Sequence, residues 1–411
     1  MGKTFLQLKS MEEARRLLEA FSPLPRTEQV TLREALGRIP AEPIETPEAL
    51  PAFNRSLMDG FALRASDAAS AKETAPVFLD LIGQVQMGLA PRQSVGPGQA
   101  MAIPTGAMLP SGADAVVMVE HTRPIGPESI EVCRAVAPGQ HILGRGEDLA
   151  QGTRILPAGR RLTPLDLGAL AACGLVTLSV CALPRVAILS TGDELVDPDE
   201  KPGPAQVRDT NALTLAAQVT QAGGQPLRLG RVPDDASALL NATGKAVEQA
   251  DMVLLSGGSS VGVRDHTTTV LDKLSGGKLL LEGIALSPGK PTLLADIGGK
   301  PVFGMPGHPI SSFVVFHVLV ASLLRRMSGA HPPWKKQGLR GRLTENVESA
   351  PGRESWLRVR LEETREGWSV IPVRGGSAVY SSLAHCDALL RLPAGLEGHA
   401  AGDEVEVEVL R

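Results

Sequence analysis

The stretches RVAILSTGDEL (185–195) and DMVLLSGGSSVGVRDHT (251–267) decide the fold of this chain. Each opens with a continuous apolar run, which is typical of a strand that is buried on both faces of a sheet. Two helix-length segments, 211–222 and 236–250, lie between them. This alternation of buried strands and helices predicts right-handed βαβ units, and therefore a doubly wound α/β domain with a parallel sheet over residues 184–329.

The flanking segments follow other patterns. From about residue 73 to 140, short apolar runs alternate with glycine and proline, which predicts a small β domain inserted into the chain. Ser10, with Glu13 three residues later, predicts the start of a helix over 10–21. After the Pro-rich joint HPPWKK (331–336), segments of period two predict a small C-terminal β barrel or sandwich.

Composition argues against several classes of protein. The 411 residues include 41 Lys and Arg and 45 Asp and Glu, and the net charge of −4 supplies no basic field for nucleic acid. The four cysteines have no zinc-binding spacing, so we expect reduced thiols. The N-terminus has no apolar signal core, and the longest apolar stretch, 313–324, is too short to span a bilayer. We therefore expect a cytoplasmic protein that binds neither nucleic acid nor a membrane.

Polar loops follow the predicted strands of the α/β domain. Because ligands bind outside the carboxyl ends of parallel strands, we expect these loops to form one site. The loops are 190–194, 233–235, 256–262 and 287–291. Their glycines and small hydroxyl residues let a phosphate approach the backbone, and Lys290 supplies a positive charge. The pattern predicts an anion-binding site.

Three carboxylates, Glu194, Asp234 and Asp265, belong to these loops or follow them directly. They would repel an anion unless a hard cation such as Mg²⁺ bridges the two, so phosphate with Mg²⁺ is the expected ligand set. Taken singly, such an aspartate is more often a turn or helix cap than a ligand, and a lone Gly-Gly is usually a turn. The sequence contains no Walker A loop, dinucleotide fingerprint, zinc-protease motif or nucleophile elbow.

Seven motifs run through essentially the whole chain. They are PAFNRSLMDGFA (51–62), PTGAMLPSGADAVVMVE (104–120), GRGEDLAQG (144–152), LSTGDEL (189–195), LLSGGSSVGVRDHT (254–267), SPGKP (287–291) and GMPGHPIS (304–311). In their order and spacing they resemble the molybdopterin molybdenumtransferase family, known as MoeA in bacteria and as the E domain of gephyrin in animals. Seven ordered motifs are far more specific than any one of them.

The resemblance implies the last step of molybdenum cofactor synthesis. The family binds adenylyl-molybdopterin, hydrolyses its phosphoanhydride with Mg²⁺ and molybdate, and inserts molybdenum at the dithiolene with release of AMP. It also implies a homodimer, with contact to the molybdopterin adenylyltransferase and to cofactor-accepting enzymes. The implied domains are a discontinuous linker and dimerisation domain (1–50 and 141–183), an inserted β domain (51–140), the molybdopterin-binding α/β domain (184–329) and a C-terminal β barrel (330–411).

Functional residues of the family carry over onto matching positions. The implied catalytic set is Asp59, Thr105, Glu194, Asp234 and Asp265. The last three are assigned to Mg²⁺ by their physical role, and in the family the first two face the catalytic domain of the other subunit. The implied substrate- and anion-binding residues are Ser190, Thr191, Gly192, Gly257, Gly258, Ser259, Ser260, Lys290, Pro291 and Arg325. The implied pocket loop of the C-terminal domain contains Ser377, Ser381 and Ser382, with no signal to choose among them.

Three departures from the family pattern concern the anion. Ser287 and Gly283 replace basic residues that are common in the family, and His308 replaces a common Asn. These changes leave the anion affinity and the choice between molybdate and tungstate open. Two alternative functions also remain: a molybdopterin adenylyltransferase, which shares the α/β domain, and a non-catalytic scaffold on the same fold. The extra β domains argue against the first, and the intact acidic cluster argues against the second.

Overall fold

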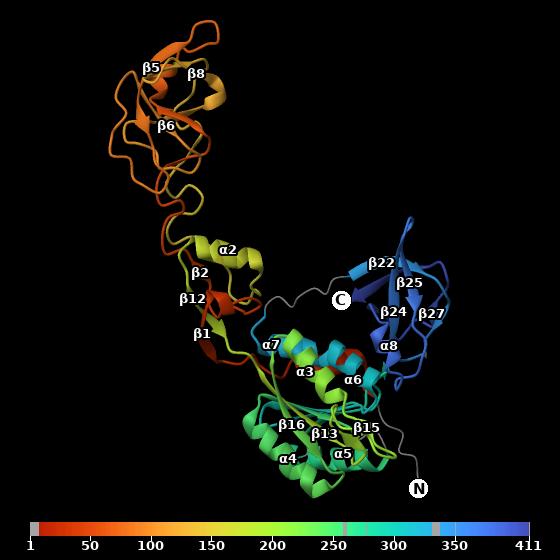
Figure 1. Ribbon diagram of the computed structural model, residues 1–411. Coiled ribbons are helices and arrows are strands. Elements are labelled where there is room, and N and C mark those ends of the chain that lie inside the picture. Colours follow the sequence, from red (N-terminus) through yellow and green to blue (C-terminus); the bar gives the residue numbers. More distant parts are fainter. Residues whose placement is uncertain (1–7, 258–260, 277, 331–337, 350, 411) are drawn as a thin grey trace.

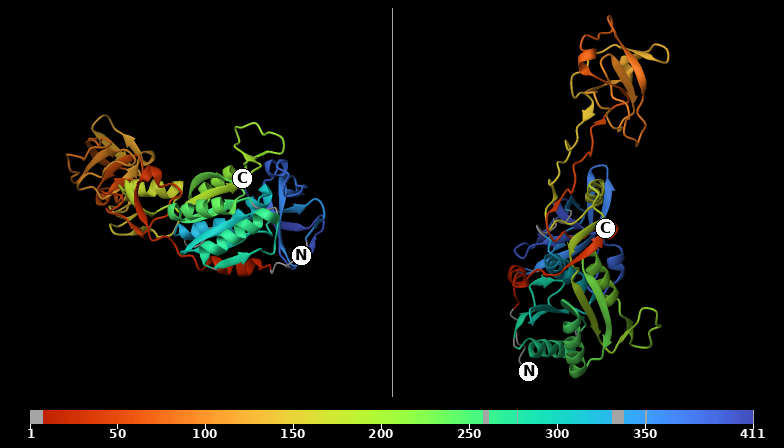
Figure 2. Two further views of the ribbon diagram at one scale, coloured as in Figure 1. Left: turned by 90° about the horizontal axis from the view of Figure 1, so that it is seen from below. Right: turned by 90° about the vertical axis from the view of Figure 1, so that its left-hand side faces the viewer.

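The chain forms an elongated molecule in a computed structural model (Figures 1 and 2). A β-rich unit lies at one end, a small unit around the helix α2 (Pro164–Ala172) follows, and an α/β unit with the C-terminal β unit beside it lies at the other end. The structure describes residues 8–257, 261–276, 278–330, 338–349 and 351–410, but not the side chains of 261–265.

A six-stranded sheet forms the centre of the α/β unit, in the order β16-β13-β17-β21-β20-β18. Its strands are β13 (Arg185–Thr191), β16 (Gln225–Val232), β17 (Met252–Ser256), β18 (Leu279–Glu282), β20 (Leu293–Ile297) and β21 (Lys300–Met305). The first four in this order are parallel to one another, as predicted. In contrast, β20 runs antiparallel to both β21 and β18, so the prediction of a wholly parallel sheet is wrong at this edge.

A two-residue turn explains the reversed strand. Gly298 and Gly299, with φ angles of 64° and 82°, join β20 to β21. Two residues with positive φ make the tight turn of an antiparallel hairpin, whereas parallel neighbours need a long crossover. Because β20 is reversed, it begins at the edge where the parallel strands end, and Leu293 pairs with Gly304. The turn 287–291 therefore approaches the expected edge of the sheet.

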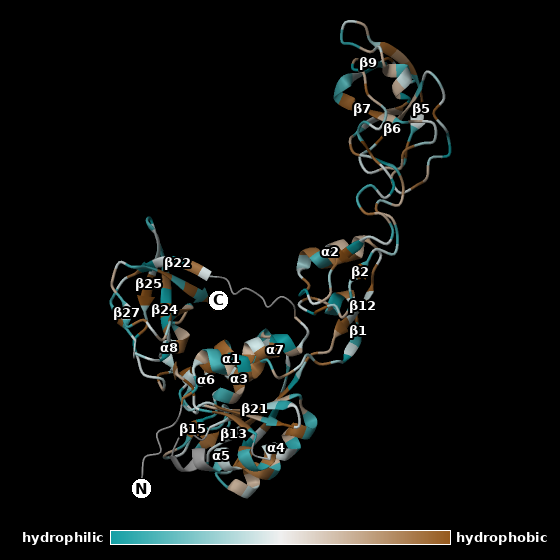
Figure 3. Ribbon diagram, turned by 180° about the vertical axis from the view of Figure 1, so that it is seen from behind, coloured by the Kyte–Doolittle hydropathy of each residue, from teal (hydrophilic) through white to brown (hydrophobic). Residues whose placement is uncertain are grey.

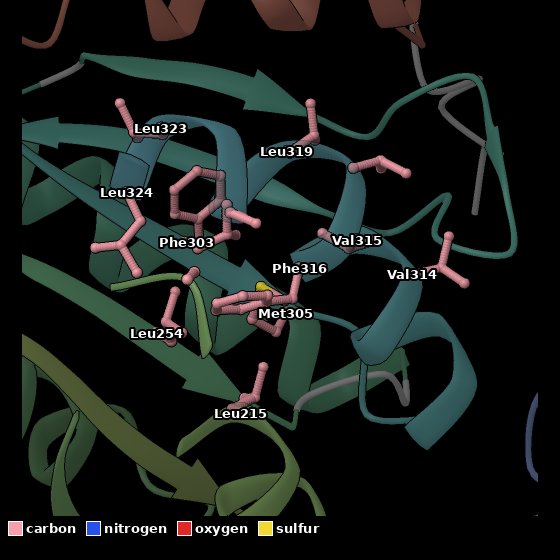
Figure 4. Packing of buried hydrophobic residues seen from close by; sticks show 14 of the residues in the cluster. Leu215, Leu254, Phe303, Met305, Val314, Val315, Phe316, Leu319, Leu323 and Leu324 are labelled. Atoms are coloured by element: carbon pink, nitrogen blue, oxygen red, sulfur yellow. The ribbon is translucent and has the colours of Figure 1, made fainter. Parts of the chain in front are cut away.

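Helices cover both faces of the sheet, so the unit is doubly wound as predicted. One face carries α3 (Asn211–Gln221), α6 (Pro309–Val315) and α7 (Ala321–Met327), and the other carries α4 (Ala236–Gln249) and α5 (Val261–Ser275). Figure 4 shows the first of these layers, in which Leu254 and Phe303 of the sheet pack with Phe316 and Leu324 of the long helical segment. The core thus consists mainly of aliphatic side chains.

The segment from α6 to α7 is a core helix. A π-helical turn, Phe316–Val320, joins its two halves. Among the described residues this segment, Pro309–Met327, is the one helix long and apolar enough to cross a membrane, and most of it is buried inside the protein. The expectation that no apolar stretch reaches a spanning length is therefore wrong for this helix, although its burial in the α/β core accounts for its apolar character.

The helix α1 (Met11–Leu18) begins at the expected cap, where Ser10 and Glu13 form a reciprocal capping box. Figure 3 shows hydrophilic and hydrophobic residues along it, as in an amphipathic helix. Its buried residues, Met11, Ala14 and Leu18, belong to the core of the α/β unit. The first helix therefore packs with the α/β unit, although the sequence groups it with the linker segments.

Paired strands connect this unit to the distal β unit. They are β1 (Thr27–Thr31) with β12 (Thr177–Cys181), β2 (Ile44–Glu45) with β11 (Arg154–Leu156), and β3 (Arg55–Ser56) with β10 (Ile142–Leu143). Beyond them lies a sheet in the order β7-β4-β6-β5-β9-β8. Its strands are β4 (Gly60–Leu63), β5 (Val77–Gln84), β6 (Gln99–Ile103), β7 (Ala115–Met118), β8 (Thr122–Pro124) and β9 (Ser129–Val132). The chain therefore enters and leaves the distal β unit through these paired strands.

The C-terminal unit is a closed barrel rather than a sandwich. Its strands are β22 (Gly338–Leu343), β24 (Glu354–Thr364), β25 (Gly367–Pro372), β26 (Ala388–Leu392) and β28 (Glu404–Val409). They pair in the order β24-β25-β22-β28-β26, and a further pairing of β26 with β24 closes the ring. A closed ring leaves no open sheet edge.

A buried carboxylate joins the barrel to the rest of the molecule. Glu354, whose side chain is 5% exposed, accepts hydrogen bonds from Arg15 of α1 at 3.1 Å and from Arg391 of β26 at 2.7 Å. Nearby, His317 of the π-helical turn lies 2.9 Å from Glu408 of β28. Because Glu354 is paired from both sides, the barrel and α1 are held in a fixed relation.

Leu254→Ala should destabilise the α/β unit by about 2–5 kcal/mol, because it removes buried methyl groups and leaves a cavity between sheet and helices. Leu254 is fully buried in β17. Urea unfolding followed by circular dichroism measures the loss. Leu165→Ala in α2, where the side chain is 85% exposed, is the matched control and should change stability by less than about 0.5 kcal/mol. Equal losses in the two variants would contradict the assignment of this core.

Candidate functional site

A cavity of about 410 Å³ opens at the carboxyl edge of the parallel strands. It lies where the loops after β13 and β17 meet the starts of α3 and α6 and the C-terminal barrel (Figure 1). The lining residues are Thr191, Gly192, Glu194, Leu195, Val207, Arg208, Asp209, Thr210, Asn211, Asp234, Ser256, Gly257, Gly307, His308, Pro309, Ala378 and Tyr380. This volume and position are typical of a small-molecule site.

Two glycines let the backbone close tightly around the cavity. Gly257 has a φ of 127°, and a Cβ there would lie 2.2 Å from the carbonyl oxygen of Thr191. Gly192 has a φ of 144°, and a Cβ there would lie 2.5 Å from a carboxylate oxygen of Glu194. At Gly257 a larger residue would collide with the backbone of Thr191, whereas at Gly192 it would meet the end of a side chain that can move, and the positive φ is what favours glycine there. Gly257 is therefore needed to bring the ends of β13 and β17 together.

Three buried oxygens at the ends of β13 and β16 have no hydrogen-bond partner within the described part of the chain, and two of their residues, Thr191 and Asp234, line the cavity. They are Ser190 Oγ, Thr191 Oγ1 and Asp234 Oδ1. Ser190 and Thr191 are almost completely buried, at 1% and 3% exposure. An unpaired buried polar group costs about 1–3 kcal/mol, so such a cluster is typical of a site that a polar ligand completes.

The acidic residues of the site repel one another. Burial, and then the nearby Asp193 and Glu194 carboxylates, raise the pKa of Asp234 above its usual range. The Asp234 amide donates a weak hydrogen bond to Asp193 at 3.3 Å, which opposes this shift only in part. A carboxylate held close to two others is stabilised in its ionised form when a cation joins the group.

A hard cation therefore fits the chemistry of these donors. Glu194 and Asp234 both line the cavity, and the unpartnered Asp234 oxygen supplies an acceptor. No group of three or more His, Cys, Asp or Glu gathers around one point among the residues that the structure describes. Asp265, the third predicted member, begins the second turn of α5, and its side chain lies outside the description. Two carboxylates can hold Mg²⁺ when a phosphate supplies further oxygens.

Several predicted anion-binding residues do not line the cavity. Lys290 is exposed in the turn before β20, with Pro291 beside it, and neither is among the lining residues. The predicted residues Gly258, Ser259 and Ser260 lie outside the described part of the chain, so this comparison does not cover them. Arg325 lies near the end of α7, whereas the cavity lies at the start of α6, about 24 Å away at the rise of a helix. Burial and the nearby Arg161 lower the pKa of Arg325.

Of the three departures from the family pattern, only His308 lines the cavity. Ser287 ends the short strand β19 (Leu286–Ser287), which pairs with β24 of the barrel. Gly283 adopts a φ of 90°, which a basic residue could adopt only with strain. Because neither of these two positions lines the cavity, the lost cations do not change its lining.

Asp59 and Thr105 lie together but apart from the cavity. An Asp59 carboxylate oxygen accepts a hydrogen bond from the Thr105 amide at 2.7 Å, and both residues are exposed. They belong to the distal β unit, at the other end of the molecule in every view (Figures 1 and 2). Within one chain, therefore, the five predicted catalytic residues do not form one site.

Sequence analysis missed the residues at the start of α3. Arg208, Asp209, Thr210 and Asn211 all line the cavity. Asp209 Oδ1 accepts from the Ala212 amide at 3.1 Å, and Asn211 donates to the Gly307 carbonyl at 2.8 Å. The run Asp-Thr-Asn before an apolar helix is a helix-start signal, and it could have marked this corner of the site.

The barrel loop contributes differently from the serines named by sequence. Ser377 Oγ lies 2.8 Å from His308 Nδ1, and Ala378 and Tyr380 line the cavity. Ser382 is buried and donates its hydroxyl hydrogen to the Val379 carbonyl, so it stabilises the turn instead. Of the three serines, Ser377 is thus bonded to a cavity-lining residue.

Comparisons with known proteins agree along the whole chain. Family models match at residues 9–174 (MoeA N-terminal region, domain I and II), 187–326 (probable molybdopterin binding domain) and 340–410 (MoeA C-terminal region, domain IV). Proteins named molybdopterin molybdenumtransferase from Nostoc sp. and Bacillus subtilis are 34% and 32% identical, covering 93% and 98% of this chain and 88% and 94% of their own.

A solved structure has the same fold. The crystal structure of the molybdopterin biosynthesis MoeA protein from Pyrococcus horikoshii matches with a TM-score of 0.86 at 32% identity, covering 98% of this chain and 100% of that one. The family models, the relatives and this structure all extend over the distal β unit, the α/β unit and the barrel. The chain therefore belongs to the MoeA family of molybdopterin molybdenumtransferases, which are transferase enzymes.

Proposed function

We propose that this chain is a molybdopterin molybdenumtransferase that binds adenylyl-molybdopterin in the cavity at the carboxyl edge of the α/β sheet. Water cleaves the phosphoanhydride in a Mg²⁺-dependent step, AMP leaves, and molybdenum from molybdate, or tungsten from tungstate, is inserted at the dithiolene. The observation that carries this proposal is the group of buried oxygens of Ser190, Thr191 and Asp234, which have no partner among the described residues and lie near the turns at Gly192 and Gly257. An anion together with a cation satisfies all three.

The chain's own residues have separate tasks. The hydroxyls of Ser190 and Thr191 can donate to phosphate oxygens, and Gly257 permits the close approach. Glu194 and Asp234 would hold Mg²⁺, which supplies positive charge to the phosphate oxygens of the anhydride. Asp234 also lines the cavity and, as a carboxylate, can accept a proton from the attacking water. Asp265 is assigned to the same acidic group.

A second copy of the chain completes the site in this proposal. Asp59 and Thr105 lie far from the cavity of their own chain and expose their side chains at the other end of the molecule. In a symmetric dimer, the distal β unit of one subunit can face the cavity of its partner. In this proposal the dimer acts in the cytoplasm and contacts the molybdopterin adenylyltransferase and the cofactor-accepting enzymes.

The decisive experiment incubates purified protein with adenylyl-molybdopterin and Mg²⁺, with and without molybdate or tungstate. AMP release and metal retained on the pterin are measured together. Oxyanion-dependent AMP release with metal insertion is expected. Formation of adenylyl-molybdopterin from molybdopterin and ATP would instead establish the adenylyltransferase. A protein inactive in both directions would leave the scaffold as the better description.

Asp234→Asn should lower the rate of AMP release by about 10²-fold, because it removes the proton acceptor and a charge that holds the cation. The same change should stabilise the metal-free protein at neutral pH. Folding raises the pKa of Asp234, so this carboxyl binds more protons in the folded state than in the unfolded state, and its contribution to wild-type stability falls as pH rises above about 3.8. Thermal unfolding at neutral pH and below this value measures the difference, which should vanish in acid.

The matched control is Asp235→Asn. Asp235 is exposed, and its side chain caps α4 by accepting from the Ala238 amide, a role that asparagine retains. Activity and stability should both stay at wild-type values. An Asp234→Asn protein that turns over normally, or that is less stable than wild type at neutral pH, would remove Asp234 from the proposed site.

Mixed dimers test whether two subunits share each site. Asp59→Asn and Asp234→Asn chains, each inactive alone, are coexpressed with different tags. Random association makes half of the dimers mixed. If the distal unit of one subunit serves the other's cavity, one of the two sites in each mixed dimer carries neither change, so about a quarter of wild-type activity returns. Asparagine can still accept from the Thr105 amide, so this variant changes charge alone. No recovery in purified mixed dimers would rule out sharing.

A further inference from the structure

The C-terminal barrel forms one wall of the cavity through residues 375–380. The Tyr380 hydroxyl lies 2.6 Å from Thr210 Oγ1, and Ser377 Oγ lies 2.8 Å from His308 Nδ1. Thr210 and His308 are the N-cap residues of α3 and α6, yet neither side chain caps its own helix. Both side chains instead hold the barrel loop against the α/β unit.

The barrel side fixes the same loop. Arg358 of β24, which is buried, donates to the Gly375 carbonyl at 2.6 Å. Ser382, the second residue of the short helix α8 (Ser381–Ala384) and also buried, donates to the Val379 carbonyl at 2.6 Å. The loop is therefore anchored from both units, and its position over the cavity is set before any ligand binds.

Tyr380 is chemically distinctive at this place. It is the only tyrosine among the 411 residues of the chain. Of the described residues that line the cavity, Tyr380 and His308 are the two with aromatic rings. Although its hydroxyl is bonded, Tyr380 remains 49% exposed, so much of its ring is open to a ligand. Flat aromatic surfaces of this kind favour stacking with a flat heteroaromatic ring.

We propose that Tyr380 is a positioning residue for a flat nitrogen heteroaromatic ring of the substrate, and that Thr210 holds it in place through the hydroxyl. This inference rests on the proposed function, whose substrate carries two such rings, the pterin and the adenine. The phosphates occupy the glycine turns at Thr191 and Gly257, and one of the rings lies against Tyr380 at the barrel wall. The barrel thereby determines substrate specificity.

The first test separates binding from chemistry. Tyr380→Phe and Thr210→Val each remove one partner of the hydrogen bond and should raise KM about 2- to 10-fold, with a smaller change in kcat. The double variant should be no weaker than either single variant, because both changes remove the same interaction. Tyr380→Ala, which also removes the ring, should raise KM more than tenfold. Trp368→Phe in β25, an aromatic residue that does not line the cavity, is the control.

The second test reads Tyr380 directly and needs no turnover. Because the chain has one tyrosine, its tyrosinate absorbance during a pH titration reports this residue alone. AMP and a pterin monophosphate are added separately to the wild-type protein, and the ring that contacts Tyr380 should shift the titration or the tyrosine absorption band. The Tyr380→Phe protein supplies the blank. The probe that changes the tyrosine signal shows whether the adenine or the pterin ring contacts Tyr380.

The outcomes distinguish a failure of the proposed function from a failure of the role assigned to Tyr380. A wild-type protein without AMP release removes the proposed function, whereas the titration still decides whether Tyr380 meets a heteroaromatic ring. If the wild type is active but Tyr380→Ala keeps the wild-type KM and neither probe alters the tyrosine signal, the positioning role is overturned and the proposed function stands. Additive effects of Tyr380→Phe and Thr210→Val would overturn the part assigned to Thr210.

Discussion

The parallel register between β13 and β17 is the constraint on which the site depends. Ser190 lies opposite Ser256 in this register, so the next residues, Thr191 and Gly257, meet at the edge of the sheet. Their backbones come so close that a Cβ on Gly257 would collide with the Thr191 carbonyl. The hydroxyls of Ser190 and Thr191, at the end of β13, are buried and have no partner among the residues that the structure describes. Strand pairing thus creates the narrow turn and places these hydroxyls beside it.

Stability and binding oppose each other in this cavity. Asp234 shares the edge with Asp193 and Glu194, and the folded protein disfavours its ionised form. The surrounding units maintain this arrangement, because the α/β core is large and Glu354 joins α1 and the barrel through two arginines. A well-packed scaffold can hold like charges together until a ligand neutralises them. The three carboxylates therefore stay close together because the packing between the units holds their loops in place.

Local patterns predicted the parts of the fold that depend on short-range rules. Buried strands, helices on both faces and the capping box at Ser10 followed from periodicity and cap chemistry, and the loops containing Thr191, Glu194 and Asp234 do meet at one edge. The reversed β20 was missed because the strand alone has no direction, although Gly298-Gly299 carried the signal. Tyr380 was missed because its partner Thr210 lies 170 residues away, and no local pattern encodes that pairing.

The packing of α1 into the α/β core has a consequence for the order in which the chain folds during synthesis. α1 precedes the distal β unit in the chain, yet other members of its core cluster, such as Met252, Phe303 and Leu319, are translated only after that unit. The distal unit, with its own core, can fold while Met11, Leu18 and Phe21 remain uncovered. The nascent chain therefore carries the apolar face of α1 exposed until the α/β unit has been translated, and this face is a target for chaperones that hold unfolded segments.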